Sequence, residues 1–209
     1  MRVVSVVNRK GGCGKSTLAT ALAGTFASGG VPTAIIDLDP QGSATAWGAC
    51  RPAERSSVKV VRSKPGTLDD DLRRLAAEGV MMTIIDPPPH NDAAIAGALS
   101  EADAILMPAL ASAFDLHSLA SLMDGVRQTG KPIGVVLNAV TPGTVGLREA
   151  VGAIDAMGLP LLATVARRMA WQYAAARGLS PTELEPRGEA ANEVRALCEA
   201  VIKLLEGGR

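Results

Sequence analysis

The sequence contains few aromatic residues and few cysteines. Only five of its 209 residues are aromatic, namely two Trp, two Phe and one Tyr. The three cysteines, Cys13, Cys50 and Cys198, are far apart and form no Cys-x-x-Cys pair. Their odd number and wide spacing argue against a disulfide framework, a zinc site and an iron–sulfur ligand set. Any cofactor is therefore expected to be held by other groups.

Long apolar runs and an excess of charge of one sign are absent as well. No apolar stretch approaches the roughly 18 residues that a transmembrane helix needs, and the N-terminus lacks the pattern of a signal peptide. Basic and acidic residues both number 21, so the net charge is zero. The 47% of hydrophobic residues exclude a disordered chain. We expect a single cytoplasmic domain over residues 1–209.

One segment, residues 51–64, is locally basic. Its only acidic residue is Glu54, and its basic residues are Arg51, Arg55, Lys59, Arg62 and Lys64. A solvated loop is the simplest interpretation, because a run of charge usually forms wet surface. A contact with nucleic acid remains the alternative for this segment.

Short apolar runs bounded by Gly and Pro alternate with Ala-rich segments of helical periodicity. This pattern is typical of a parallel sheet buried between helices. The predicted strands are Arg2–Val7, Thr33–Asp37, Val80–Asp86, Ala104–Met107, Ile133–Asn138 and Leu161–Val165. The predicted helices are Ser16–Ser28, Thr67–Glu78, Phe114–Gln128, Thr144–Met157 and Glu189–Glu206. The fold class is therefore α/β, a mostly parallel sheet flanked by helices in three layers.

A glycine-rich segment joins the first predicted strand to the first helix. It runs Asn8-Arg9-Lys10-Gly11-Gly12-Cys13-Gly14 and continues into Lys15-Ser16-Thr17. We call residues 8–14 the phosphate loop, because glycines let successive backbone N–H groups turn toward an anion at a helix N-terminus. Lys15 can reach the β- and γ-phosphates of a nucleotide, and the Ser16 hydroxyl can bind Mg²⁺. The predicted nucleotide-binding residues of this segment are Gly11, Gly12, Cys13, Gly14, Lys15, Ser16 and Thr17.

The phosphate loop departs from the general pattern G-x-x-x-x-G-K-[ST] at one position. Arg9 stands where that pattern has glycine, and a second lysine, Lys10, follows. The loop resembles the deviant Walker A motif, K-G-G-x-G-K-[ST], of the ParA/MinD group of P-loop ATPases. The resemblance implies that Lys10 crosses a nucleotide-sandwich homodimer to the partner's phosphates, as an arginine finger does. It also suggests a small ParA without the N-terminal helix-turn-helix of larger members.

Two acidic segments follow predicted strands and extend the resemblance. Asp37-Leu38-Asp39-Pro40-Gln41-Gly42 is similar to the ParA signature D-x-D-P-Q-G, although two helix-capping aspartates are an alternative interpretation. Carboxylates at strand ends lie where α/β folds bind ligands. The resemblance implies that Asp39 positions the attacking water and that Asp37 supports the Mg²⁺ shell.

The third predicted strand has the pattern of a Walker B strand. Its apolar residues end at Asp86, followed by Pro87-Pro88-Pro89, and such an aspartate holds Mg²⁺ through water in phosphoryl-transfer sites. Asn138 ends another strand where relatives place a polar residue against adenine, but asparagine is also an ordinary turn residue. The predicted metal residues are thus Ser16, Asp37 and Asp86, and the catalytic ones are Lys10, Lys15 and Asp39.

The resemblance implies an ATP-dependent partition or positioning ATPase. Such proteins dimerise with ATP, bind nucleoid DNA without sequence preference and are released when a ParB-like or other cargo adaptor stimulates hydrolysis. The cofactors would be ATP or ADP and Mg²⁺, and the cargo a plasmid, a chromosome or another body. The candidate DNA contacts, besides the segment 51–64, are Arg167, Arg168, Arg177, Arg195 and Lys203.

Two other functions remain as alternatives. A membrane-cycling ATPase of the MinD kind would need a basic amphipathic tail, whereas the last ten residues contain only Lys203 and Arg209 as basic residues. A metabolic P-loop enzyme, such as a dethiobiotin-synthase-like ligase, would need a substrate pocket that the sequence does not reveal. The tail and Asp39-Pro40-Gln41 favour the positioning ATPase over the membrane-cycling one, and Lys10 and the Pro40-Gln41 pair favour it over the metabolic enzyme.

Overall fold

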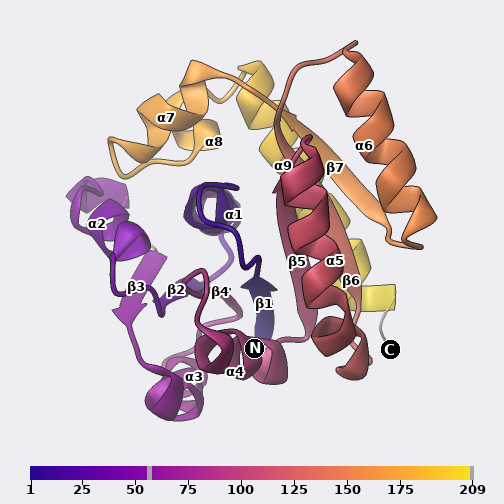
Figure 1. Ribbon diagram of the computed structural model, residues 1–209. Coiled ribbons are helices and arrows are strands. Elements are labelled where there is room, and N and C mark those ends of the chain that lie inside the picture. Colours follow the sequence, from indigo (N-terminus) through magenta and orange to yellow (C-terminus); the bar gives the residue numbers. More distant parts are fainter. Residues whose placement is uncertain (56–57, 208–209) are drawn as a thin grey trace.

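The computed structural model describes residues 1–55 and 58–207. The strands in these residues form one seven-stranded sheet. The strand order is β3-β2-β4-β1-β5-β6-β7, and every recorded strand pair is parallel (Figure 1). The strands are β1 (Arg2–Val6), β2 (Thr33–Asp37), β3 (Val58–Arg62), β4 (Met82–Asp86), β5 (Ala104–Leu110), β6 (Ile133–Val140) and β7 (Leu161–Ala166). All carboxyl ends therefore meet at one edge of the sheet.

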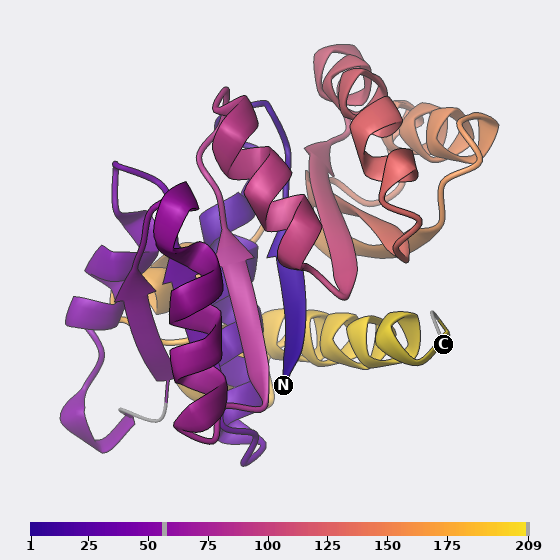
Figure 2. The same ribbon diagram turned by 90° about the horizontal axis from the view of Figure 1, so that it is seen from below.

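Helices cover both faces of this sheet. They are α1 (Lys15–Ser28), α2 (Ser43–Ala49), α3 (Leu68–Ala77), α4 (Asp92–Glu101), α5 (Ala113–Gln128), α6 (Val145–Ala156), α7 (Met169–Ala175), α8 (Pro181–Leu184) and α9 (Glu189–Gly207). One core cluster joins the sheet to α3, α4, α5 and α6, and a second joins it to α1, α2, α7 and α9. Figure 2 shows α9, in yellow, on the other side of β5 and β6 from α5 and α6.

The burial of the strands explains their composition. Along β1, Val3 belongs to the first core cluster, whereas Val4 and Val6 belong to the second. Every residue of β2 and of β4 is buried. A strand covered on both faces needs apolar residues at consecutive positions rather than at alternate ones. The apolar runs in the sequence therefore mark the central strands directly.

The structure confirms the α/β prediction and adds elements that the sequence did not reveal. All six predicted strands and all five predicted helices are present, with ends shifted by three residues at most. The interpretation of residues 51–64 as a solvated loop is wrong, because β3 and the 3₁₀ helix Ala53–Arg55 lie within it. β3 is an edge strand in which Lys59 and Arg62 are exposed, so its charges concealed it. Ser56 and Ser57 of this segment, and the tail residue Arg209, lie outside the described residues.

Candidate nucleotide site

The phosphate loop connects β1 to α1 and has the backbone of an anion cradle. Gly12 and Gly14 adopt φ angles of +77° and +98°, a region that residues with a side chain rarely enter. A Cβ atom at Gly14 would also lie 2.0 Å from the Nδ2 atom of Asn138. Because α1 begins at Lys15, the loop lies at a helix N-terminus, where an anion is stabilised.

A buried asparagine, Asn8, fixes the start of the phosphate loop. Its Nδ2 atom donates to the Pro108 carbonyl oxygen at 2.7 Å, and its Oδ1 atom accepts from the Lys10 backbone N–H at 2.9 Å. The Ser118 hydroxyl donates to the same Oδ1 atom at 2.7 Å. The sequence near Asn8 gives no sign of these contacts, because its partners in β5 and α5 are about a hundred residues away. Asn8 thereby ties the loop to β5 and α5.

The two lysines of this region have different partners. Lys15 is buried, and its ammonium donates to the Lys10 carbonyl oxygen at 3.0 Å. The Lys10 ammonium lies 2.5 Å from the Oδ2 atom of Asp115, which is fully buried in the first turn of α5. The Ser112 hydroxyl also donates to Oδ2, while the Oδ1 atom of Asp115 has no partner among the described residues. The side chain of Lys10 is therefore held by its own subunit.

Asp37 and Asp86 end the adjacent strands β2 and β4 and face each other in register. The carboxylate of Asp37 is satisfied by the protein itself. Its Oδ1 atom accepts from the Asp39 backbone N–H at 3.1 Å, and its Oδ2 atom accepts from the backbone N–H and hydroxyl of Thr45, both at 2.8 Å. Asp37 thus organises the loop that contains Asp39.

Asp86 differs from Asp37 in that neither of its carboxylate oxygens has a hydrogen-bond partner among the described residues. Burial, with smaller contributions from the charges of Asp37 and Asp39, raises the pKa of Asp86 to about 7, and Ser16 and Lys15 act in the opposite direction. A buried carboxylate without partners is costly unless a cation compensates it. Asp86 and the Ser16 hydroxyl therefore fit Mg²⁺, which takes few protein ligands and completes its shell with phosphate oxygens and water.

Asp86 and its described neighbours need further ligands, from outside the protein, to complete a metal site. No group of three or more His, Cys, Asp or Glu side chains that could hold a metal occurs in residues 1–55 and 58–207. A dedicated protein cage is thus absent from the described part of the chain. This composition agrees with a Mg²⁺ ion that arrives with a nucleotide and shares its phosphates.

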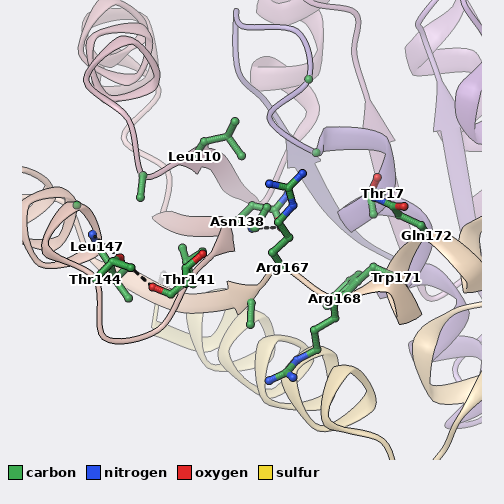
Figure 3. A pocket seen from close by; sticks show the side chains of 17 residues that line it. Thr17, Leu110, Asn138, Thr141, Thr144, Leu147, Arg167, Arg168, Trp171 and Gln172 are labelled. Atoms are coloured by element: carbon green, nitrogen blue, oxygen red, sulfur yellow. Dashed lines mark hydrogen bonds between the residues drawn. The ribbon is translucent and has the colours of Figure 1, made fainter.

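A cavity of about 560 Å³ opens beside the phosphate loop (Figure 3). Gly12, Gly14 and Thr17 line it from one side, and the end of β6 and the segment between β7 and α7 line it from the other. Within it, Asn138 donates from Nδ2 to the Cys13 carbonyl oxygen at 2.9 Å. Its size is in the range of small-molecule sites, and its place next to the loop suits the nucleoside of a bound nucleotide.

The chain matches a family model described as the CobQ/CobB/MinD/ParA nucleotide binding domain over residues 4–182. It belongs to this family. Two relatives called maintenance of carboxysome distribution protein A cover most of the chain. The protein of Halothiobacillus neapolitanus is 31% identical over 207 residues, 95% of each chain. That of Gloeobacter kilaueensis is 34% identical over 202 residues, 93% of this chain and 89% of the relative.

Solved structures support the same fold. The septum site-determining protein MinD of Pyrococcus horikoshii, complexed with Mg-ADP, superposes with a TM-score of 0.76. The match covers 100% of this chain and 98% of that one at 18% identity. This likeness confirms the predicted P-loop NTPase fold.

In this ParA/MinD-type ATPase, two predicted DNA contacts lie at the nucleotide cavity. The Arg167 side chain points into the cavity beside Asn138 in Figure 3. Arg168 also lines the cavity and forms ion pairs with Glu189 and, at 3.0 Å, with Glu193. Their positions favour a role at the cavity over the DNA contact that the family resemblance suggested.

The remaining predicted DNA contacts are exposed. The guanidinium carbon of Arg177 lies 5.8 Å from the centroid of the Tyr173 ring. The guanidinium of Arg195 donates to the side-chain oxygen of Asn192 at 3.0 Å. Lys203 on α9 forms no ion pair with any described residue. These three residues remain available for a partner.

Cys13 is held inside the phosphate loop as a structural residue. It is buried, and burial raises the pKa of its thiol. A thiol with a raised pKa is a poor nucleophile, because the thiolate is the reactive form. The contribution of Cys13 to the site is thus expected from its backbone.

Proposed function

We propose that this chain is a positioning ATPase, built on a single domain, which dimerises with ATP, binds DNA without sequence preference and moves an intracellular cargo. The observation that carries the proposal is Asp86, a buried carboxylate without protein partners beside Ser16 and Lys15. This arrangement provides for a Mg²⁺ nucleotide. Lys10, in the position of the ParA/MinD signature lysine, adds the element that a switch needs and a simple nucleotide-binding enzyme does not.

The residues at the carboxyl edge of the sheet divide the work of phosphoryl transfer. Lys15 and the backbone N–H groups of the phosphate loop would bind the phosphates, and Ser16 and Asp86 would hold Mg²⁺. Bound Mg²⁺ neutralises phosphate charge in such sites. Asp39 would orient the attacking water, and its Oδ1 atom already accepts from the Gln41 N–H at 2.9 Å. Slow hydrolysis is expected, since no strong general base lies at the site.

The homodimer would form across the edge that contains Lys10. To reach the phosphates of a second subunit, the Lys10 ammonium must leave Asp115, from which it lies 2.5 Å in the monomer. ATP would offer a more highly charged partner for this cation than one carboxylate does. Dimerisation would then depend on the nucleotide.

The exposed cations would contact DNA through its phosphates. Arg177 and Lys203 are exposed and have no acidic partner among the described residues, and Arg195 contacts only neutral groups there. Contacts of this kind are insensitive to sequence and weaken as salt rises, because counterions are released on binding. The expected DNA binding is therefore nonspecific and salt-dependent.

The cargo is proposed from the relatives. The two relatives that are more than 30% identical over more than nine-tenths of the chain are both named for maintaining carboxysome distribution. We therefore favour a carboxysome-like body over a plasmid or a chromosome, with an adaptor on the cargo that stimulates hydrolysis. The adaptor takes the place that a ParB-like protein has in plasmid and chromosome partition.

The test compares DNA with membrane for the ATP-bound protein. An Asp39→Ala variant should bind ATP and hydrolyse it slowly, and with Mg²⁺ and ATP it should be retained by nonspecific duplex DNA. Lys15→Ala serves as the control that cannot bind nucleotide and should not be retained. Retention on anionic vesicles but not on DNA would replace the proposal by the MinD-like alternative.

Neither the length of the helices nor the apolar face of α9 supports a membrane contact in the described part of the chain. No helix in it is long and apolar enough to cross one. In α9, the apolar residues Val194, Leu197, Val201 and Leu205 are buried against the rest of the protein. An amphipathic helix binds a bilayer with its apolar face, and that face of α9 is occupied.

A further inference from the structure

One cation of the basic segment contacts the loop that contains Asp39. Arg62 is the last residue of β3 and is paired in register with Asp37. Its Nη2 atom donates to the carbonyl oxygen of Pro40 at 2.8 Å. Two other cations of the segment have acidic partners, Arg51 on Glu183 and Lys59 on Glu78. Arg62 is thus distinguished by a backbone partner at the proposed catalytic site.

The loop from Asp39 to Gly42, which we call the aspartate loop, is a tight turn with few anchors. The Gly42 backbone N–H donates to the Asp39 carbonyl oxygen at 2.8 Å, and Gly42 has a φ of +68°. The Gln41 N–H donates to the carboxylate of Asp39 at 2.9 Å. The orientation of the Asp39 carboxylate is therefore set by the backbone of the next two residues.

The aspartate loop is anchored on two sides. On the inner side, Asp37 accepts from the Asp39 N–H at 3.1 Å. On the outer side, Arg62 holds the carbonyl of Pro40, the residue between Asp39 and Gln41. Without the outer anchor, Pro40 and Gln41 are held only by the hydrogen bonds within the turn, so the turn can shift together with the Asp39 carboxylate.

We propose that Arg62 is a positioning residue for ATP hydrolysis, which acts by fixing the aspartate loop so that Asp39 is aimed at the attacking water. This inference rests on the proposed function, because it assigns Arg62 a part in the hydrolysis that Asp39 supports. Arg62 would act through Asp39 without contacting the nucleotide or the attacking water.

The surroundings of Arg62 make the inference testable, because its removal leaves the core unchanged. Arg62 is exposed at the edge of the sheet and lines an open cleft of about 530 Å³ together with Asp39, Lys64 and Asn91. Substitution of exposed residues usually changes stability little. Variants at position 62 are therefore expected to fold.

Lys64 provides a matched control in the same cleft. It has the same charge as Arg62 and is exposed, but its ammonium contacts no acceptor in the described ranges 1–55 and 58–207. Lys64→Ala therefore removes the same charge beside Asp39 without releasing Pro40. A difference between the two variants reports the hydrogen bond rather than the field of a cation.

The expected effect lies on the chemical step. Small displacements of a catalytic group reduce rates strongly, so Arg62→Ala should lower kcat for ATP about tenfold. The Kd of ATP should stay within about twofold, because the phosphates are bound by Lys15 and the phosphate loop. Arg62→Lys should restore most of the rate, since its ammonium can donate to the same carbonyl, and Lys64→Ala should match the wild type.

The decisive experiment is a double-mutant cycle with Asp39→Ala, measured as kcat under saturating Mg²⁺ and ATP. If Arg62 acts through Asp39, Arg62→Ala should change the residual rate of the Asp39→Ala variant less than twofold. Arg62→Gln provides a second substitution that removes the charge of Arg62. The Tm of every variant is measured to exclude a loss of folding. A tenfold further loss in the Asp39→Ala background, or a wild-type rate for Arg62→Ala, would overturn the inference. If instead the wild type shows no Mg²⁺-dependent hydrolysis, the proposed function itself fails.

Discussion

The Lys10 ammonium lies 2.5 Å from the buried carboxylate of Asp115, 105 residues further along the chain. Lys10 cannot keep this ion pair and also reach the phosphates of a second subunit. The monomer is therefore stabilised by a contact that the proposed ATP dimer would have to give up. In that dimer the ion pair would oppose dimerisation, and a single substitution can remove it.

We expect Asp115→Asn to strengthen dimerisation with ATP. The amide keeps the shape of the carboxylate but not its charge, so Lys10 is released more easily. An ion pair with one exposed member is worth up to about 1 kcal/mol, and each subunit of a dimer would give up one, so the dimer dissociation constant should fall by up to about thirtyfold. Sedimentation equilibrium with Mg²⁺ and ATP measures it.

Two control variants isolate the contribution of Lys10. Ser112→Ala removes the other donor to the Asp115 Oδ2 atom and should not strengthen dimerisation. In a Lys10→Ala background, Asp115→Asn should have no effect on the dimer. An equal gain in the presence and absence of Lys10 would show that the ion pair is irrelevant to dimerisation.

Lys15→Ala should abolish nucleotide binding. Lys15 is buried and donates to the Lys10 carbonyl oxygen inside the phosphate loop, so it lies where phosphates would be bound. Loss of this cation removes a charge-assisted contact that no neighbouring residue replaces. Titration with a fluorescent ATP analogue measures the loss, and unchanged affinity would show that the phosphate site is misplaced.

The stability of the nucleotide-free protein should fall as pH rises from about 4 to about 7. The pKa of Asp86 is raised from 3.8 to about 7 by burial, so the folded state keeps the proton that the unfolded state releases. The contribution of Asp86 to the free energy of unfolding is fully present below the unfolded-state pKa and is lost as pH rises through the folded-state pKa. The loss is roughly 4 kcal/mol at most. Chemical denaturation across this range measures it.

Asp86→Asn is the control for this pH dependence. The amide does not ionise, so this part of the pH dependence should vanish, and Mg²⁺ should no longer strengthen ATP binding. If Asp86→Asn unfolds with the same pH profile as the wild type, the raised pKa of Asp86 is not the cause.

Replacement of Ala139 by glycine should stabilise the protein. It follows Asn138 at an irregularity of β6 and has a φ of +50°, which is unfavourable for any residue with a side chain. Ala139→Gly should raise the free energy of unfolding by about 0.5–1 kcal/mol, whereas Ala139→Val should lower it. Equal stability of the three proteins would show that this backbone is not strained.

The parts of the site that could be predicted from the sequence are those that depend on chain neighbours. Glycines before Lys15 mark the phosphate loop, and strands that end at Asp37 and Asp86 bring these carboxylates to one edge, because parallel strands share it. The neighbouring residues in the sequence are enough to predict the positions of such site residues. The fold class followed from the same apolar runs.

The parts that could not be predicted depend on distant contacts. Asp115 is joined to Lys10 only by folding, and nothing near it in the sequence indicates an ion pair. Arg62 was one charge in a basic segment until β3 placed it beside Asp37. Arg167 and Arg168 were candidate DNA contacts by resemblance to basic C-terminal positions of the family, but the turn after β7 directs Arg167 into the cavity.

Sedimentation velocity of the Asp39→Ala protein tests whether the ATP dimer depends on Lys10. With Mg²⁺ and ATP this variant should sediment as a dimer, and with ADP as a monomer. Adding Lys10→Ala should return it to a monomer while ATP binding persists. A Lys10→Ala, Asp39→Ala protein that binds ATP and remains a dimer would contradict the account.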